Sequence, residues 1–195
     1  YDNQVPACIN TYVTDRKYTI GPKATFLLSE SLGADLSLLS NEIDKLFIGL
    51  EEGTEITPAL VQDKIGINRD YNIFELQEAI GTKDVLKANR IINHFAANDK
   101  DNPPPKVLAT LYGYFCKILR YHTLTDKSKF TAAQALGVNP FFVDSYSRAA
   151  GNYPLGKVRH IFGYLKECDL KSKGIENPSI EGGELMKELV YKILH

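Results

Sequence analysis

The sequence predicts an all-α protein made of two helical bundles, a small one over residues 1–67 and a larger one over residues 68–195. Apolar residues recur every three or four positions along nearly the whole chain, which places them on one face of successive helices. The strict alternation of apolar and polar residues that is typical of half-buried strands is nearly absent. Prolines and glycines punctuate the chain where helices would begin and end.

The first bundle is expected to contain four helices. Each begins at a proline or at a residue that can cap a helix, and three end near a glycine, of which Gly49 suits a left-handed stop. The predicted helices cover residues 6–17, 22–33, 35–49 and 57–66. The polar connector that follows, residues 68–71, is the best candidate for the boundary between the bundles.

The second bundle is expected to contain seven helices with broad apolar faces. They cover residues 72–80, 84–96, a long stretch beginning after residue 105, then 131–136, 140–150, 154–173 and 184–194. Gly81 is expected to stop the first of these helices. The proline-rich segment 99–105 is interpreted as a surface turn between antiparallel helices. No repeat of fixed period is visible.

Composition and charge exclude several classes of protein. Hydrophobic residues make up 44% of the chain and charged residues 24%, as in an ordinary globular protein. A net charge of −1 argues against tight DNA binding by this chain alone. The single methionine is Met186, so the chain is expected to be a piece of a longer protein. No leader or membrane span is recognised at its start, and a cytoplasmic location is expected.

No active site can be assembled from the sequence. The three cysteines, Cys8, Cys116 and Cys168, are far apart and are expected to be buried, reduced thiols in helices. The histidines lack the spacing of metal or nucleophile motifs. Carboxylate pairs such as Glu51–Glu52 and Glu75/Glu78 are interpreted as solvated. We therefore expect no catalytic residue, no metal and no cofactor.

A helix-turn-helix is a possible alternative for residues 131–150. Gly137 would supply the turn, and the following helix would then read DNA. That helix, however, carries Phe141, Phe142, Val143 and Tyr146, with Arg148 as its only cation. A reading helix should present polar and basic side chains to base edges. A packing role is therefore preferred, and a helix-turn-helix DNA-binding protein remains the alternative function.

Four segments carry a family resemblance. They are Gly33–Ser37, Asn41–Leu46, Asn72–Leu76 and the Leu-Gly-x-x-Pro-Phe-x-Val segment Leu136–Val143. In these segments the chain resembles the delta subunit of bacterial DNA polymerase III, a clamp-loader protein. The resemblance implies a small AAA+ lid-like bundle followed by a larger collar-like oligomerisation bundle. It extends from about Tyr1 to the last helix, without the family's clamp-contacting domain.

The same resemblance implies a role in DNA replication without catalysis. Active clamp-loader ATPases carry an arginine at the start of the lid helix, and Ser37 stands at that position here. A hydroxyl cannot stabilise transferring phosphoryl charge as a guanidinium does. No phosphate-binding G-x-x-x-x-G-K-[ST] loop occurs either. The expected protein is a non-catalytic subunit of the DNA-directed DNA polymerase holoenzyme.

The partners implied by the resemblance are proteins and DNA. The collar would join the other clamp-loader subunits, and the sliding clamp would be reached only through the absent N-terminal domain. DNA would be met as part of the complex, and no membrane is involved. The chain would thereby help to load the clamp onto primed DNA.

The candidate partner-binding residues combine broad contact area with directional hydrogen bonds, as tyrosine and arginine do at interfaces. Tyrosines occupy more than one face of the long helix after residue 105, whose apolar stripe is already full. The candidates are Tyr114, Arg120, Tyr121, Arg148 and Arg159. The alternative is that they form partly buried rims of a monomeric bundle.

Overall fold

The structure is a computed structural model that describes residues 4–33, 35–66, 71–98, 100, 102–175 and 181–195. Within these residues the chain folds into eleven α-helices, one short 3-10 helix and a single pair of two-residue strands. The predicted all-α fold is confirmed. The chain divides into two compact units, Tyr1–Arg69 and Asp70–His195. The predicted boundary between residues 67 and 68 lies outside the described residues, and so does most of the polar connector.

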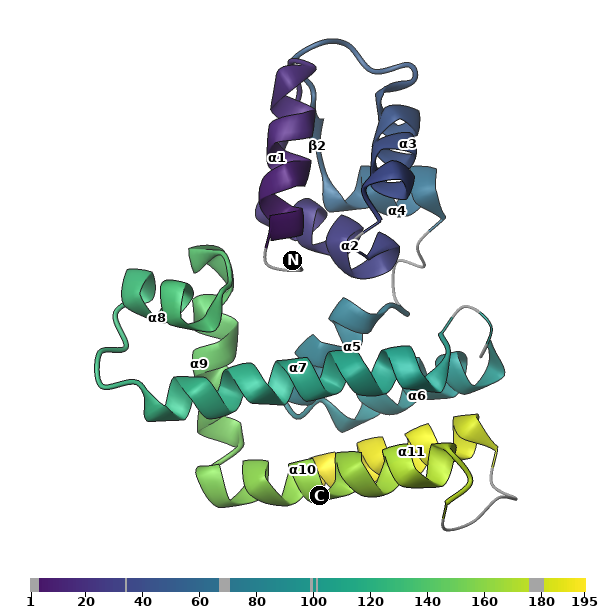
Figure 1. The fold of residues 1–195 in the computed structure, drawn as a ribbon, viewed down its shortest axis with the longest axis vertical. Helices are drawn as coiled ribbons and strands as arrows, with labels where there is room; N and C mark the ends of the chain where they lie inside the picture. Colours follow the sequence, from purple (N-terminus) through teal and green to yellow (C-terminus); the bar gives the residue numbers. More distant parts are fainter. Residues whose placement is uncertain (1–3, 34, 67–70, 99, 101, 176–180) are drawn as a thin grey trace. The chain divides into compact units, whose positions relative to one another are not determined.

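The first unit contains four helices and the two strands (Figure 1). The elements in chain order are α1 Val5–Asp15, β1 Thr19–Ile20, α2 Pro22–Leu32, α3 Leu36–Phe47, β2 Glu55–Ile56 and α4 Pro58–Ile65. The strands pair in parallel, with Thr19 opposite Glu55. This pairing was not predicted, because two-residue strands leave no alternating pattern in a sequence.

Capping residues start two helices of the first unit, α3 and α4, where the sequence predicts. The Asp35 carboxylate accepts hydrogen bonds from the backbone N–H groups of Ser37 at 2.9 Å and Leu38 at 3.1 Å. Such a cap stabilises a helix by about 1 kcal/mol, since it satisfies donors that the helix leaves open. Thr57 caps α4 in the same way, and Gly66 ends that helix in the left-handed conformation. Local sequence therefore determines these helix boundaries.

The second unit contains the remaining helices. In chain order they are α5 Ile73–Gly81, α6 Val85–Ala97, α7 Pro104–Thr123, α8 Lys129–Leu136, the 3-10 helix η2 Pro140–Phe142, α9 Val143–Asn152, α10 Leu155–Ser172 and α11 Gly182–Leu194. The predicted helix over residues 140–150 is in fact two elements, because Pro140 opens a tight turn before α9 begins.

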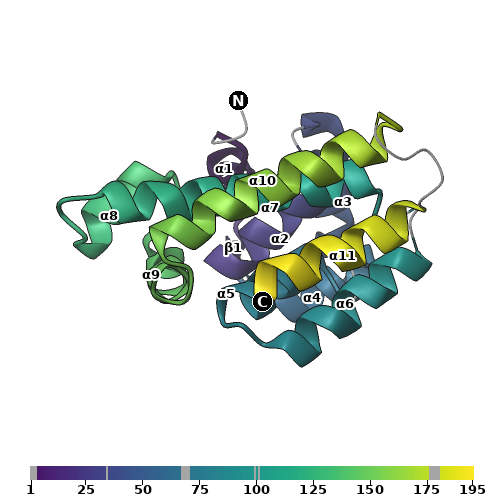
Figure 2. The same ribbon diagram turned by 90° about the horizontal axis from the view of Figure 1, so that it is seen from below.

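The long helices of the second unit pack side by side (Figure 2). Helix α11 packs between α6 and α10, and α7 packs along the other flank of α10. The rings of Tyr112 on α7 and Phe162 on α10 lie 5.6 Å apart, while His122 at the end of α7 bonds the carbonyl of Tyr153 just before α10. Helices α7 and α10 are therefore antiparallel neighbours, and α10 is in contact with a different helix on each flank.

A buried tyrosine ties the start of α10 to α5. Tyr153 is fully buried, and its hydroxyl donates a hydrogen bond of 2.8 Å to the carbonyl of Ile80. Burial raises the pKa of this phenol well above its ordinary value. Asn152 adds a bond to the carbonyl of Gly81 at 2.9 Å. These bonds satisfy carbonyls at the end of α5 that the helix itself cannot pair.

Gly81 ends α5 as predicted and also leaves room for a neighbouring side chain. It is the last residue of α5 and has no positive φ, whereas Lys83 after it has a φ of 56°. A Cβ at position 81 would lie 2.3 Å from the hydroxyl oxygen of Tyr114. The glycine therefore allows the buried tyrosine to approach the backbone, and α5 ends at Gly81 as predicted.

No helix in the described part of the chain combines the length and the apolar character needed to cross a membrane.

Candidate functional site

Two of the predicted partner-contact residues lie in the core of the second unit. Tyr114 is 6% exposed and Tyr121 is 7% exposed. The Tyr114 ring packs against Phe115 and Tyr146, and burial raises its pKa. The hydroxyl of Tyr121 donates to Ser147 at 2.9 Å. These tyrosines join α7 to α9, so the expectation that they are accessible to a partner is corrected.

The tyrosines are buried because α7 is covered on more sides than its aliphatic residues indicate. Its aliphatic stripe accounts for the contact with α10 and the core, and α9 then covers the flank that carries Tyr114 and Tyr121. A prediction based only on the aliphatic residues of α7 places Tyr114 and Tyr121 on the surface. The same helix carries a tyrosine that is exposed, Tyr112, which is 55% accessible and was not a candidate. Its place at the edge of the aliphatic stripe is the signal that could have identified it.

The three predicted arginines lie at the surface on three different helices. Arg120 on α7 donates from Nη1 to the carbonyl of Ala135 at 2.9 Å, which closes the end of α8. Arg148 lies on α9 and Arg159 on α10, both exposed. Their role in partner binding stays a prediction.

The segment predicted as a helix-turn-helix forms a compact hairpin of α8, η2 and α9. Gly137 takes the left-handed conformation after α8, with a φ of 65°. The Asn139 side chain then accepts a hydrogen bond from the backbone N–H of Phe141 at 2.9 Å and caps η2. Two phenylalanines, Phe130 and Phe141, are 76% and 53% exposed. Exposed aromatic rings beside few cations favour a protein contact over base reading.

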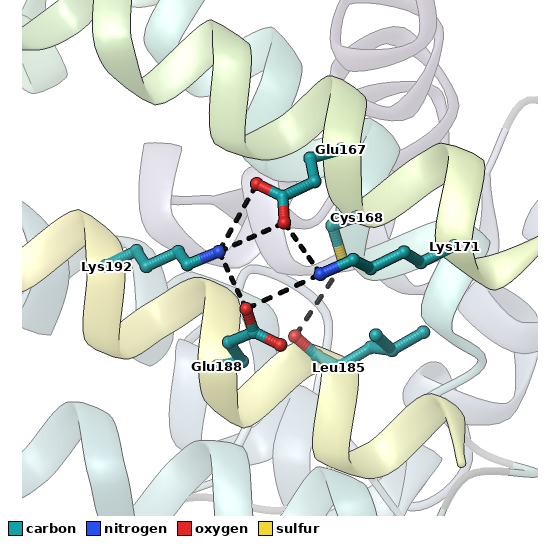
Figure 3. A network of polar contacts seen from close by, with 6 residues as sticks. All are labelled: Glu167, Cys168, Lys171, Leu185, Glu188 and Lys192. Carbon is teal, nitrogen blue, oxygen red and sulfur yellow. Dashed lines mark hydrogen bonds and ion pairs between the residues drawn. The ribbon is translucent and has the colours of Figure 1, made fainter. Parts of the chain in front are cut away.

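An ion-pair network joins α10 to α11 (Figure 3). Glu167 bonds Lys171 at 2.6 Å and Lys192 at 3.2 Å, and Glu188 bonds Lys192 at 2.6 Å and approaches Lys171 at 3.7 Å. Hydrogen bonds from Lys171 and Lys192 lower the pKa of Glu167, and a bond from Lys192 lowers that of Glu188. Two carboxylates and two ammonium groups alternate, so their charges compensate one another.

The thiol of Cys168, beneath this network, is expected to be unreactive. Cys168 is buried and lies against the carbonyl of Leu185 at 3.7 Å. Burial raises its pKa to about 11, which leaves it protonated near neutral pH. Cys116 is partly exposed, and Cys8 is exposed on α1, so the prediction of three buried thiols was wrong for Cys8. Cys8 lies on the outer side of α1, where the apolar stripe does not reach.

Metal-ligating side chains do not gather into a cluster in the described residues. There, no group of three His, Cys, Asp or Glu side chains is placed to hold a metal ion. Among the same residues, every buried side-chain nitrogen and oxygen has a hydrogen-bond partner. Ser37, the residue at the predicted arginine position, is exposed in the first turn of α3. The described residues therefore form packed helices whose outer surfaces differ in charge and in exposed aromatic residues.

By its architecture the chain belongs to the class of all-α helical-bundle proteins. A family model described as the DNA polymerase III delta subunit, C-terminal domain, matches residues 70–185. The chain belongs to that family. The match lies within the second unit and covers the helices from α5 to the start of α11.

A solved structure has the same fold. The Bacillus subtilis DNA clamp loader delta protein (YqeN) aligns with a TM-score of 0.63 and 24% sequence identity, over 99% of this chain and 56% of that chain. The present chain therefore spans little more than half the length of this relative. No protein of curated function matches the chain significantly.

Proposed function

We propose that this chain is the lid-and-collar portion of a clamp-loader delta subunit and works in DNA replication as a non-catalytic, cytoplasmic component of the DNA polymerase III holoenzyme. In this proposal residues 1–67 form the AAA+ lid-like domain and residues 68–195 the collar-like domain. The collar holds the other loader subunits. The assembled loader then places the sliding clamp on primed DNA, and the clamp is contacted outside the residues present here.

The observation that carries the proposal is the family match over the second unit. It is supported by the architecture of that unit, in which the helices share one continuous hydrophobic core. Close-packed helices hold a fixed geometry and pass displacement to their neighbours, which is what a ring of mechanically coupled subunits requires. The exposed Phe130 and Phe141 offer the kind of aromatic surface that anchors protein interfaces.

The test is co-purification with the other clamp-loader subunits of the same organism. We expect a stable complex at micromolar concentration, with no ATP hydrolysis by the chain alone and no binding of the sliding clamp by the chain alone. A Phe130→Ala/Phe141→Ala variant tests the hairpin surface, with Tyr191→Ala as the control, because Tyr191 is a similarly exposed aromatic residue on α11. Failure to associate at micromolar concentration would contradict the proposal.

A further inference from the structure

The near-neutral charge of the whole chain conceals two units of opposite charge. Residues 1–69 carry 6 Lys and Arg against 10 Asp and Glu, whereas residues 70–195 carry 17 against 14. The first unit therefore has a net charge of −4 and the second a net charge of +3. The total of −1 is therefore the sum of an acidic first unit and a basic second unit.

Two long stretches of the second unit contain no carboxylate at all. Residues 102–125, which include α7, carry three Lys and Arg, and residues 145–166, which include most of α9 and the first two thirds of α10, carry four. Because α7 and α10 are neighbours, the acid-free stretches lie together in the fold. We call the outward surface of these two helices the α7–α10 face. It consists of Tyr112, Cys116, Lys117, Arg120, Arg159 and Lys166.

Helical spacing aligns these side chains. Tyr112, Cys116 and Arg120 follow one another at intervals of four on α7 and form one row. Tyr112 meets Phe162 edge to face across the helix pair, and Arg159 and Lys166 lie three before and four after Phe162 on α10. Both of these cations are exposed. An exposed aromatic ring is thus flanked by cations from both helices.

The cations of the α7–α10 face lack the carboxylate partners found elsewhere on the same helix. Within the described residues, Lys117, Arg159 and Lys166 form no ion pair, and Arg120 bonds only a carbonyl. On the other flank of α10, by contrast, Lys171 and Lys192 are both paired with Glu167 and Glu188. The α7–α10 face therefore has positive charge that this chain does not neutralise.

We propose that the α7–α10 face binds the backbone of single-stranded nucleic acid, with Tyr112 as the stacking residue. A groove that combines cations along the backbone with an exposed aromatic ring is the arrangement that binds single strands without sequence preference. An acidic peptide would use the cations but not the ring. A duplex, with its bases stacked inside, would not use the ring either. This inference rests on the proposed function in placing the chain near DNA, while the charges and contacts are independent of it.

The proposed site is weak by itself, in agreement with the small net charge of the second unit. Four cations that displace counterions from a single strand give a logarithmic salt dependence with a slope of about −2 to −3. We therefore expect binding in the micromolar range at 50 mM salt and its loss near 300 mM. Within a larger assembly, such a surface would guide a strand that other contacts hold.

The experiment measures fluorescence anisotropy of a labelled 20-nucleotide oligo-dT with the whole chain at 50 mM salt. Arg159→Glu/Lys166→Glu should weaken binding about tenfold or more, and Tyr112→Ala about fivefold, with Tyr112→Phe close to the wild type. The matched control is Arg90→Glu. Arg90 is an exposed arginine of α6 that forms no ion pair in the described residues, and it lies outside the α7–α10 face.

Three results would overturn the inference. One is absence of salt-dependent binding by a wild-type chain whose helical circular dichroism is intact. Another is an equal loss of binding in Arg90→Glu and Arg159→Glu. The third is tighter binding of a labelled poly-glutamate peptide than of the oligonucleotide, with no effect of Tyr112→Ala, which would assign the face to an acidic protein. These outcomes are distinct from a failure to co-purify with loader subunits, because every measurement uses the chain alone.

Discussion

The two flanks of helix α10 use similar residues for opposite purposes. Toward α11, its charged side chains are paired with partners of opposite sign, and a buried thiol lies beneath them. Toward α7, its cations Arg159 and Lys166 are exposed and form no ion pair in the described residues. The two flanks show that the number of charged residues on a helix does not by itself predict whether its surface can bind a partner. What separates a structural surface from a binding surface is whether the chain compensates the charges itself.

The largest expected effect comes from overfilling the close contact between α11 and α6, behind the packed flank of α10. A Cβ at Gly183 would lie 2.8 Å from the Cβ of Ala96 and 3.1 Å from its Cα. Gly183→Ala should therefore push α11 away from α6 and reduce the free energy of unfolding by about 1–3 kcal/mol. The measurement is urea unfolding monitored by circular dichroism.

The control for that substitution lies on the open side of α10. A Cβ at Gly163 would meet nothing within 4 Å. Gly163→Ala should stabilise the chain by up to about 1 kcal/mol, because alanine has the higher helix propensity. Equal effects of the two substitutions would show that the α6–α11 contact is packed no more tightly than the open side of α10.

A smaller effect is expected from breaking the ion-pair network. Glu167→Gln removes the carboxylate that both Lys171 and Lys192 contact. The side chain is 37% exposed, so water and salt screen the interaction, and the expected loss is about 0.5–1 kcal/mol. Arg159→Glu on the other flank should change stability by less than about 0.5 kcal/mol. If Arg159→Glu destabilised the chain more than Glu167→Gln, the proposed division of roles would be wrong.

The pH dependence of stability should have its origin in the same network. The pKa values of Glu167 and Glu188 are lowered in the folded chain from an ordinary value of 4.5. A carboxyl group with a lowered pKa in the folded state contributes stability above its unfolded pKa, and that contribution is lost as the pH falls through the folded pKa. Unfolding at pH 6, 4 and 3 should therefore show a difference between the wild type and Glu167→Gln/Glu188→Gln that shrinks toward pH 3. A difference that stayed constant would exclude the network as its source.

The smallest expected effect is a difference in the rate at which the three cysteines of the native chain are labelled. Cys8 is exposed, whereas Cys168 is buried with a pKa of about 11. At pH 8 an aromatic disulfide reagent should modify Cys8 first, then Cys116, and Cys168 only on unfolding. Mass spectrometry of partly labelled protein distinguishes the three sites. Early modification of Cys168 would mean that the flank toward α11 opens readily.

Local features of the fold could be predicted from the sequence because they depend on neighbouring residues. The helices predicted to start at Asp35, Thr57, Asn72 and Asp84 are capped by those residues, and Gly49, the predicted left-handed stop, has a φ of 80°. What could not be predicted depends on tertiary contact. The strand pair needs segments 36 residues apart, and the role of Gly81 depends on Tyr114 from another helix.

The candidate site was harder to predict for the same reason. The sequence of α7 predicts that Tyr114 and Tyr121 are on the surface, whereas α9 packs against them in the fold. Tyr112 and the unpaired cations can be recognised as one surface only when α7 and α10 are known to be neighbours, because residues of the two helices are 39 to 54 positions apart in the sequence. The absence of carboxylates in each stretch is visible in the sequence. That the two stretches form one surface follows only from the contact between α7 and α10.

The most direct test of the proposed function is hydrogen–deuterium exchange of the chain alone and in a reconstituted clamp loader. The account predicts that the α10–α11 region is already protected in the free chain and changes little. New protection on assembly should fall on outer surfaces of the second unit, including the hairpin of α8, η2 and α9. Unchanged exchange throughout the second unit in the presence of the other loader subunits would contradict the claim that this unit is a docking domain.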